Sequence, residues 1–168
     1  MEPGKLPLAM LSRILAKVPA TDDRVLLGAG LGEDAAVISF GDHLLVAKTD
    51  PITFATDRIA WYAVNVNAND LAATGARPAW FLATVLLPPA WQEAQVEQLF
   101  DELIAACQEL SISLVGGHSE VTYGLDRPIL VGCMLGEVGP QGIVRTAGAQ
   151  LGDDIILTKG LAIEGTAL

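Results

Sequence analysis

The most constraining feature of the sequence is an alternation of apolar and polar residues on both sides of Gly41-Asp42. The alternation predicts strands over residues 36–40 and 44–48, joined by a tight hairpin turn. Acidic residues bracket this hairpin: Glu33-Asp34 precede it and Asp50 follows it. Such a hairpin would place carboxylates at the ends of two antiparallel strands.

Apolar periodicity predicts the remaining elements. Helical spacing indicates helices over 8–17, over 57–75 with Asp57 and Gly75 as caps, and over 96–107. A glycine-rich loop covers 26–32, and strands are expected over 80–89, 112–117 and 127–138, with a further short apolar strand within 145–168. Strands and helices do not alternate regularly, which favours an α+β (mixed α/β) fold. We expect a mostly antiparallel sheet with helices on one face and the other face free for a partner subunit.

Composition excludes several classes of function. The 168 residues suit one domain with a real core, and they carry a formal net charge of −10 without any basic block. Nucleic acid is therefore not an expected partner, because phosphate neutralisation supplies most of such affinity. The excess carboxylate is explained either by solubility or by metal binding.

The distribution of charges argues against a membrane-spanning helix and a secretory signal. No charge-free run reaches the ~18 residues that a spanning helix needs, and Arg13 and Lys17 interrupt the apolar N-terminal stretch. We therefore expect no membrane contact and a cytoplasmic location. Cys107 and Cys133 lie in apolar patterns without a CxxC pair, which indicates buried structural thiols.

The predicted helix over 57–75 has an unusual polar pattern. Asn65, Asn67, Asn69 and Asp70 interrupt a run of Ala, Val and Leu, although Asn is a poor helix former. Asn67 and Asp70 share one face, and Asn65 and Asn69 share another. A solvated surface would normally use Glu, Lys or Gln, so we expect some of these side chains to face a polar cleft.

Carboxylates recur at the ends of the predicted elements. If the sheet brings Asp34, Asp50 and Asp70 together, their charges would repel unless a cation neutralised them. Mg²⁺ suits such a site, because it binds one or two carboxylates and completes its shell with water and phosphate oxygens. The alternative for each Asp taken singly is a turn or capping residue.

Glycine motifs add weaker signals. Gly28, Gly30 and Gly32 form GxGxG, but no predicted helix follows, so the dinucleotide fingerprint fails, and no P-loop sequence is present. The GGHSE stretch of residues 116–120 follows a strand, where amides and polar side chains could meet a phosphate or a metal ion. A Gly-Gly turn with an exposed His is the alternative.

These motifs in this order resemble the N-terminal domain of the aminoimidazole ribonucleotide (AIR) synthetase superfamily. The matching stretches are GEDAAV (32–37), KTD (48–50), NANDLAATGARP (67–78), LVGGHSE (114–120) and GDDIILTKG (152–160). The superfamily includes thiamine monophosphate kinase, selenophosphate synthetase and a hydrogenase-maturation dehydratase. GGHSEVT and TKGLAIEGTAL resemble the hydrogenase-maturation branch most.

The resemblance assigns roles to matched positions. It implies ATP and Mg²⁺ as cofactors, with Asp34, Asp50 and Asp70 as metal ligands and Glu120 as a further ligand. It also implies a nucleotide-binding role for Asn67, Asn69, Gly116, Gly117 and His118. His118 stands where several members carry an acidic residue, so either His118 or Glu120 replaces the usual acidic ligand. No catalytic residue can be assigned.

The resemblance also implies an architecture. Residues 1–150 would form an ATP- and Mg²⁺-binding and dimerisation domain, and residues 151–168 would begin a truncated C-terminal domain. The sheet would be four-stranded and would close a barrel across a homodimer. The full-length protein would then be the active enzyme, and this chain alone is expected to be inactive.

The resemblance finally implies a reaction class. We expect an ATP- and Mg²⁺-dependent subunit that activates an amide-type oxygen of an unidentified acceptor by phosphorylation, with a maturation protein as a possible partner. The alternatives are a phosphotransferase similar to thiamine monophosphate kinase and a non-catalytic dimerisation or scaffold domain. Selenophosphate synthesis is disfavoured because no reactive Cys precedes the glycine-rich loop.

Overall fold

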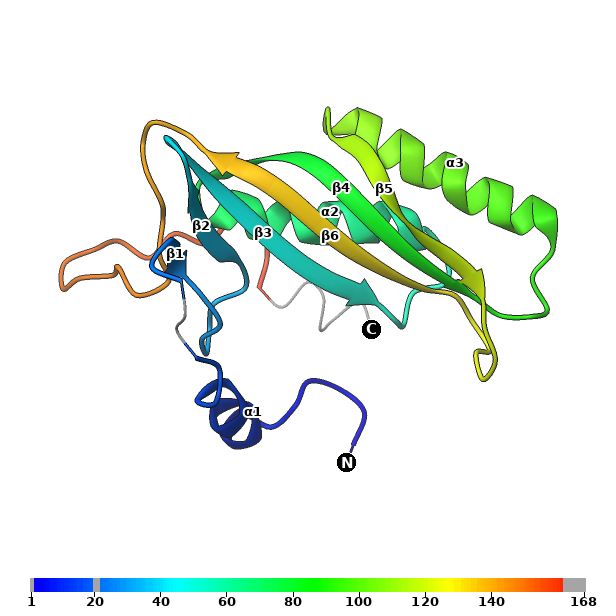
Figure 1. Ribbon diagram of the computed structural model, residues 1–168, viewed down its shortest axis with the longest axis horizontal. Helices are drawn as coiled ribbons and strands as arrows, with labels where there is room; N and C mark the ends of the chain where they lie inside the picture. Colours follow the sequence, from blue (N-terminus) through cyan, green and yellow to red (C-terminus); the bar gives the residue numbers. More distant parts are fainter. Residues whose placement is uncertain (1, 20–21, 162–168) are drawn as a thin grey trace.

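The computed structural model describes residues 2–19 and 22–161 and shows one six-stranded sheet with two helices packed on one face (Figure 1). The helices are α1 (Leu8–Leu15), α2 (Ile59–Ala73) and α3 (Glu93–Glu109). The strands are β1 (Val25–Leu27), β2 (Ala36–Phe40), β3 (His43–Ile52), β4 (Ala76–Leu87), β5 (Ser113–Val121) and β6 (Ile129–Val138). The mixed α and β class is confirmed.

The strand order in the sheet is β1-β2-β3-β6-β4-β5. Neighbouring strands are antiparallel except β4 and β5, which are parallel because α3 carries the chain back across the sheet between them. The sheet is therefore mostly antiparallel, as expected. The expected number of four strands is wrong for this chain.

Two strand predictions require correction. The prediction missed β1, a three-residue edge strand, because Val25–Leu27 leads directly into the glycine-rich loop. The short strand expected near the end of the chain is absent from the described residues 152–160, where Ile155 and Ile156 are exposed.

The hairpin of β2 and β3 forms as predicted. Phe40 pairs with His43, and Gly41 in the connecting turn has φ +63°. A two-residue loop that begins with a positive-φ glycine matches the right-handed twist of its strands. Strand β3 continues to Ile52, beyond the predicted end at 48, because it pairs with β6 along its whole second half.

Helix α2 differs from the prediction at its start. It begins at Ile59 after Arg58, which has φ 54° and forms no side-chain cap, so Asp57 is not the cap. The Ala60 amide instead donates to a carboxylate oxygen of Glu102 in α3 over 3.2 Å. At the other end Gly75, with φ +81°, follows the helix as the predicted terminating glycine.

The core lies between the sheet and the helices α2 and α3. Phe81, Met134 and Leu130 of the sheet and Leu71 and Leu103 of the helices are fully buried there. Figure 1 shows α2 behind the sheet and α3 beside its β5 edge, with α1 set apart from both. The opposite sheet face carries partly buried and exposed residues, such as Leu82 and Thr49.

Both cysteines are free thiols, but the prediction of burial is wrong for Cys133, which is only partly buried on β6. Cys107 is buried on α3, and burial raises the pKa of its thiol to about 11. The thiol therefore stays protonated at neutral pH, as expected for a structural cysteine. Among the described residues, no helix is long and apolar enough to cross a membrane.

Candidate functional site

The three aspartates predicted to converge do so, around the side chain of Lys48. The Lys48 Nζ lies 3.0 Å from Asp70 Oδ2, 3.4 Å from Asp50 Oδ2 and 3.7 Å from Asp34 Oδ1. Asp34 precedes β2, Asp50 lies on β3, and Asp70 lies on α2. The acidic cluster, meaning Asp34, Asp50 and Asp70, thus joins three segments of the chain.

The alternation of side chains along β3 directs Lys48 and Asp50 inward. Val46, Lys48 and Asp50 are successive alternate residues of β3, so they share the sheet face that α2 covers. Val46 is fully buried, and the Lys48 side chain is only 7% exposed. The exposed fraction of the side chain rises from Asp70 through Asp50 to Asp34, so the cluster opens to solvent at Asp34.

Electrostatics favour the charged form of Lys48. Burial acts to lower the pKa of the ammonium group, but the hydrogen bond to Asp70 and the charges of Asp70, Asp50 and Asp34 outweigh it, and the pKa is raised. The sequence analysis missed Lys48. Its signal was available: a lysine at an inward position of the alternating pattern, two residues after Val46 and two before Asp50.

Asn67 is the second polar residue on this face of α2, and it is fully buried. Its Nδ2 donates to the Ala63 carbonyl over 2.8 Å and to the Asp50 carbonyl over 3.4 Å. Its Oδ1 is buried without a hydrogen-bond partner among the described residues. Asn67 therefore links α2 to the backbone of β3 at Asp50, and its own Oδ1 remains a buried acceptor without a partner among the described residues.

The other asparagines do not join the cluster. Asn69 is exposed, and the Asn65 Nδ2 donates to the Trp61 carbonyl of its own helix over 3.0 Å. The expected sharing of a face by Asn67 and Asp70 is confirmed. The structure does not bring Asn69 to the same site, because it lies two positions after Asn67, more than half a helical turn away, and faces outward.

A small pocket of about 200 Å³ adjoins the acidic cluster. It is lined by Glu33, Asp34, Asp70, Ala73, Thr74, Val144, Arg145 and Thr146. The Val144 amide donates to the Thr74 carbonyl over 2.9 Å, and the Thr146 hydroxyl donates to Glu33 over 2.8 Å. The sequence analysis missed this later segment, because only folding brings residues 144–146 beside the end of α2.

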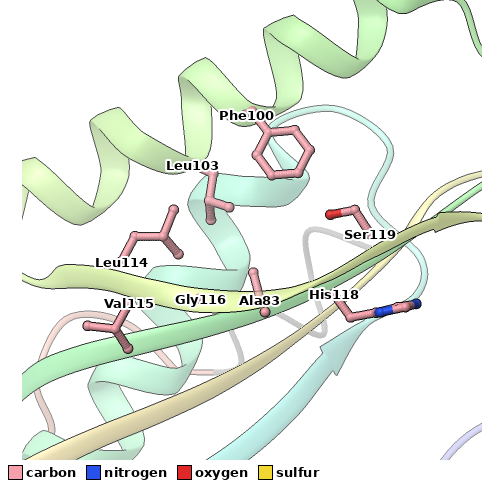
Figure 2. Close-up of a pocket in the computed structure, with 9 residues that line it drawn as sticks. Ala83, Phe100, Leu103, Leu114, Val115, Gly116, His118 and Ser119 are labelled. Atoms are coloured by element: carbon pink, nitrogen blue, oxygen red, sulfur yellow. The ribbon is translucent and has the colours of Figure 1, made fainter.

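The GGHSE stretch forms a different site on β5. The residues Gly116, Gly117, His118 and Ser119 line a pocket of about 460 Å³ together with Ala83, Phe100, Leu103, Leu114 and Val115. Figure 2 shows Phe100 and Leu103 above this pocket and Ser119 pointing up toward α3, whereas the His118 ring points away. The pocket is therefore mostly apolar, with a polar end at His118 and Ser119.

Strand register separates this pocket from the acidic cluster. Asp50 pairs with Gly132, Gly132 with Ala83, and Ala83 with Gly117, so Asp50 and Gly117 lie three strand spacings apart. That separation is roughly 14 Å. Glu120 contacts His118 over 2.9 Å rather than any aspartate of the cluster. The structure thus places Asp34, Asp50 and Asp70, with Asn67 beside them, in one group, and residues 116–118 with Glu120 in a second; Asn69 joins neither.

The acidic cluster has the donor chemistry of a magnesium site, because Mg²⁺ prefers carboxylate oxygens. Its oxygens surround the Lys48 ammonium at 3.0–3.7 Å, longer than the ~2.0–2.1 Å of a magnesium ligand. Within residues 2–19 and 22–161, no group of three or more His, Cys, Asp or Glu stands ready to hold a metal ion. The residue types fit Mg²⁺, and the cluster would have to contract to bind it.

The fold and the site define an α+β domain with a carboxylate cleft between its hairpin and its first sheet-covering helix. Residues 32–138 match the family model described as AIR synthase related protein, N-terminal domain. The chain belongs to this family.

Relatives carry several different activities. The chain is 36% identical to selenide, water dikinase of Paraburkholderia xenovorans over 175 residues, which covers 93% of this chain and 44% of the relative. It is 27% identical over 141 residues to a Methanocaldococcus jannaschii protein whose name places it in hydrogenase expression and formation. That match covers 81% of this chain and 42% of the relative. The chain thus spans less than half the length of these relatives.

A solved structure supports the fold. ThiL, the thiamine monophosphate kinase of Aquifex aeolicus, complexed with AMPPCP and TMP, matches with a TM-score of 0.64 and 25% identity. The match covers 73% of this chain and 40% of that chain. The resemblance found in the sequence is therefore confirmed at the level of family and fold.

Proposed function

We propose that this chain is the nucleotide-binding part of an ATP- and Mg²⁺-dependent enzyme that phosphorylates an amide-type oxygen. The observation that carries the proposal is the convergence of Asp34, Asp50 and Asp70 within the family region. The relative solved with AMPPCP, an analogue of ATP, supports a nucleotide as the ligand.

The acidic cluster would hold the metal ion. When bound, Mg²⁺ would neutralise the charge of the phosphate groups, and this neutralisation is the main requirement of phosphoryl transfer. Asp70 and Asp50 provide carboxylates from α2 and β3, and Asn67 fixes the two elements to each other through the Asp50 carbonyl. The protein needs to orient the acceptor oxygen and the nucleotide, and it does not need a nucleophile of its own.

The acceptor distinguishes the candidate enzymes. An amide-type oxygen on a partner maturation protein is the first candidate; the hydrogenase-related relative and the HypE-HypF complex, a structure of similar fold, agree with it. A thiamine-phosphate acceptor is the second candidate, supported by the ThiL likeness and its bound TMP. A scaffold domain without catalysis is the third, since the His118 position lacks the usual acidic residue.

The wider assembly is also a proposal. The apolar sheet face opposite α2 and α3 supports a homodimer in which two sheets close a barrel. Residues 1–150 would form the nucleotide-binding and dimerisation domain, and residues 151–168 would begin a second domain. The free thiols of Cys107 and Cys133 agree with a cytoplasmic protein, because disulfides are rare in that compartment.

Calorimetric titration of ATP with and without Mg²⁺ tests the nucleotide site. Asp70→Asn should weaken Mg²⁺-dependent binding at least about tenfold, equivalent to 1.4 kcal/mol, because it removes one carboxylate charge from the cluster. Asp101→Asn is the matched control, since Asp101 is exposed on α3. Equal ATP affinity in both variants, or affinity that needs no Mg²⁺, would contradict the proposal.

A further inference from the structure

Lys48 occupies the point on which the acidic cluster converges. Its side chain is 7% exposed, and its Nζ lies within 3.7 Å of a carboxylate oxygen from each of Asp34, Asp50 and Asp70. A lysine buried to this degree is unusual unless it is paired, and this one has three partners. The cluster therefore already holds a cation that belongs to the chain itself.

The ammonium group and a metal ion cannot share this position. Mg²⁺ needs carboxylate oxygens at ~2.0–2.1 Å in a near-octahedral shell. The oxygens nearest to the shared point contact Nζ instead, at 3.0–3.7 Å. The three carboxylates can converge on a metal ion only if the Lys48 ammonium moves away.

Displacement of the ammonium group alone would be unfavourable. The group would lose its three partners while its stem stays within β3, and a nearly buried charge without a partner is costly. An anion that arrived together with the metal ion would restore a partner. The pocket of about 200 Å³ beside Asp34 and Asp70 provides adjacent space for such a group.

We propose that Lys48 is a resident counter-cation of the acidic cluster, so that a divalent cation enters the site only together with a phosphate group that takes over the Lys48 ammonium. The role of Lys48 as counter-cation rests on the observed contacts. The identity of the anion as phosphate rests on the proposed function. Lys48 is thus a positioning residue that couples metal binding to nucleotide binding.

The test measures Mg²⁺ binding to the 168-residue chain by calorimetry, first with MgCl₂ alone and then with MgCl₂ and inorganic triphosphate. The wild-type chain should bind Mg²⁺ at least about tenfold more weakly alone than with triphosphate, within the usual range of coupling between sites. Lys48→Met should bind Mg²⁺ alone at least about tenfold more tightly than the wild type and lose most of the effect of triphosphate.

Two further variants complete the design. Lys17→Met is the matched control, because Lys17 is exposed outside the site, and it should behave as the wild type. Lys48→Arg keeps the charge and should keep weak binding of Mg²⁺ alone. Thermal unfolding without metal shows whether Lys48→Met folds; a variant that folds only when Mg²⁺ is added also supports the proposal.

Several results would overturn the counter-cation role. Equal affinity of the wild type and Lys48→Met for Mg²⁺ alone would overturn it. It would also be overturned if the wild type bound Mg²⁺ as tightly without triphosphate as with it. The proposed function fails separately: if Lys48→Met gains Mg²⁺ affinity but the wild type never binds Mg²⁺ and ATP together, the counter-cation role stands and the nucleotide site does not.

Discussion

At the scale of single residues, the site depends on a close approach between Asn67 and Gly132. A Cβ atom at Gly132 would lie 2.5 Å from Asn67 Nδ2 and 2.7 Å from the Phe81 ring, so only glycine leaves room for the buried amide. Gly132 is also the β6 partner of Asp50. The absence of a side chain on β6 therefore sets how closely α2 and Asp70 approach β3.

Gly132→Ala should reduce the free energy of unfolding by about 1–3 kcal/mol, because an added methyl group must displace well-packed atoms. Gly139→Ala is the matched control, since no atom lies within 4 Å of its added Cβ, and it should change stability by less than about 0.5 kcal/mol. Denaturant unfolding of the two variants measures the difference. Equal stability would show that the Asn67 contact tolerates the methyl group.

The residue scale also shows what the sequence can reveal. The alternation in β3 and the three-residue spacing of Asn67 and Asp70 place four polar side chains on faces that turn out to be inward. Spacing predicts which face a side chain takes, because the periods of strand and helix are fixed. It does not give the distance from Asp34 to Lys48, because that distance depends on how the loop before β2 packs.

At the scale of elements, the position of α2 depends on a contact from α3. The helix begins at Ile59, and Arg58 before it forms no side-chain cap; the Ala60 amide donates to Glu102 of α3. A carboxylate at a helix N-terminus satisfies an amide without an intrahelical partner and interacts favourably with the helix dipole. Sequence analysis assigned the cap to Asp57 because the true partner lies 42 residues away.

Glu102→Gln should lower the free energy of unfolding by about 0.3–1 kcal/mol, because it keeps an acceptor and removes its charge. Glu109→Gln, at the exposed end of the same helix, is the matched control and should have little effect. The difference should shrink in high salt, which screens the interaction of the charge with the dipole. If both variants unfold at the same denaturant concentration, Glu102 does not stabilise α2.

At the scale of the whole molecule, the predictable part of the fold is the local part. The hairpin, α3 and the strands β4 and β6 follow from periodicity within single segments. The parallel pairing of β4 with β5 and the small edge strand β1 depend on contacts between distant segments, which no local pattern specifies. The same limit explains why Asp34, Asp50 and Asp70 lie apart from the GGHSE stretch of β5, and why Asn69 joins neither site.

The sheet face opposite α2 and α3 is apolar and carries neither helix (Figure 1). Leu82 on β4 pairs with Cys133 on β6, and Trp80 pairs with Leu135; all four side chains are only partly buried. Such side chains would suit the proposed interface with a second copy of the sheet. Packing of this face against a second copy of the sheet would also form the barrel expected from the family resemblance.

Leu82→Glu should therefore convert a dimer into a monomer, because it places a charge in the middle of the buried apolar face. Ile104→Glu is the matched control: Ile104 is 43% exposed on α3, on the opposite side of the sheet, and its variant should stay dimeric. Sedimentation equilibrium gives the mass of each. A monomeric wild type at micromolar concentration, or a dimeric Leu82→Glu variant, would exclude this face as the interface and leave its apolar side chains to be covered by another part of the protein.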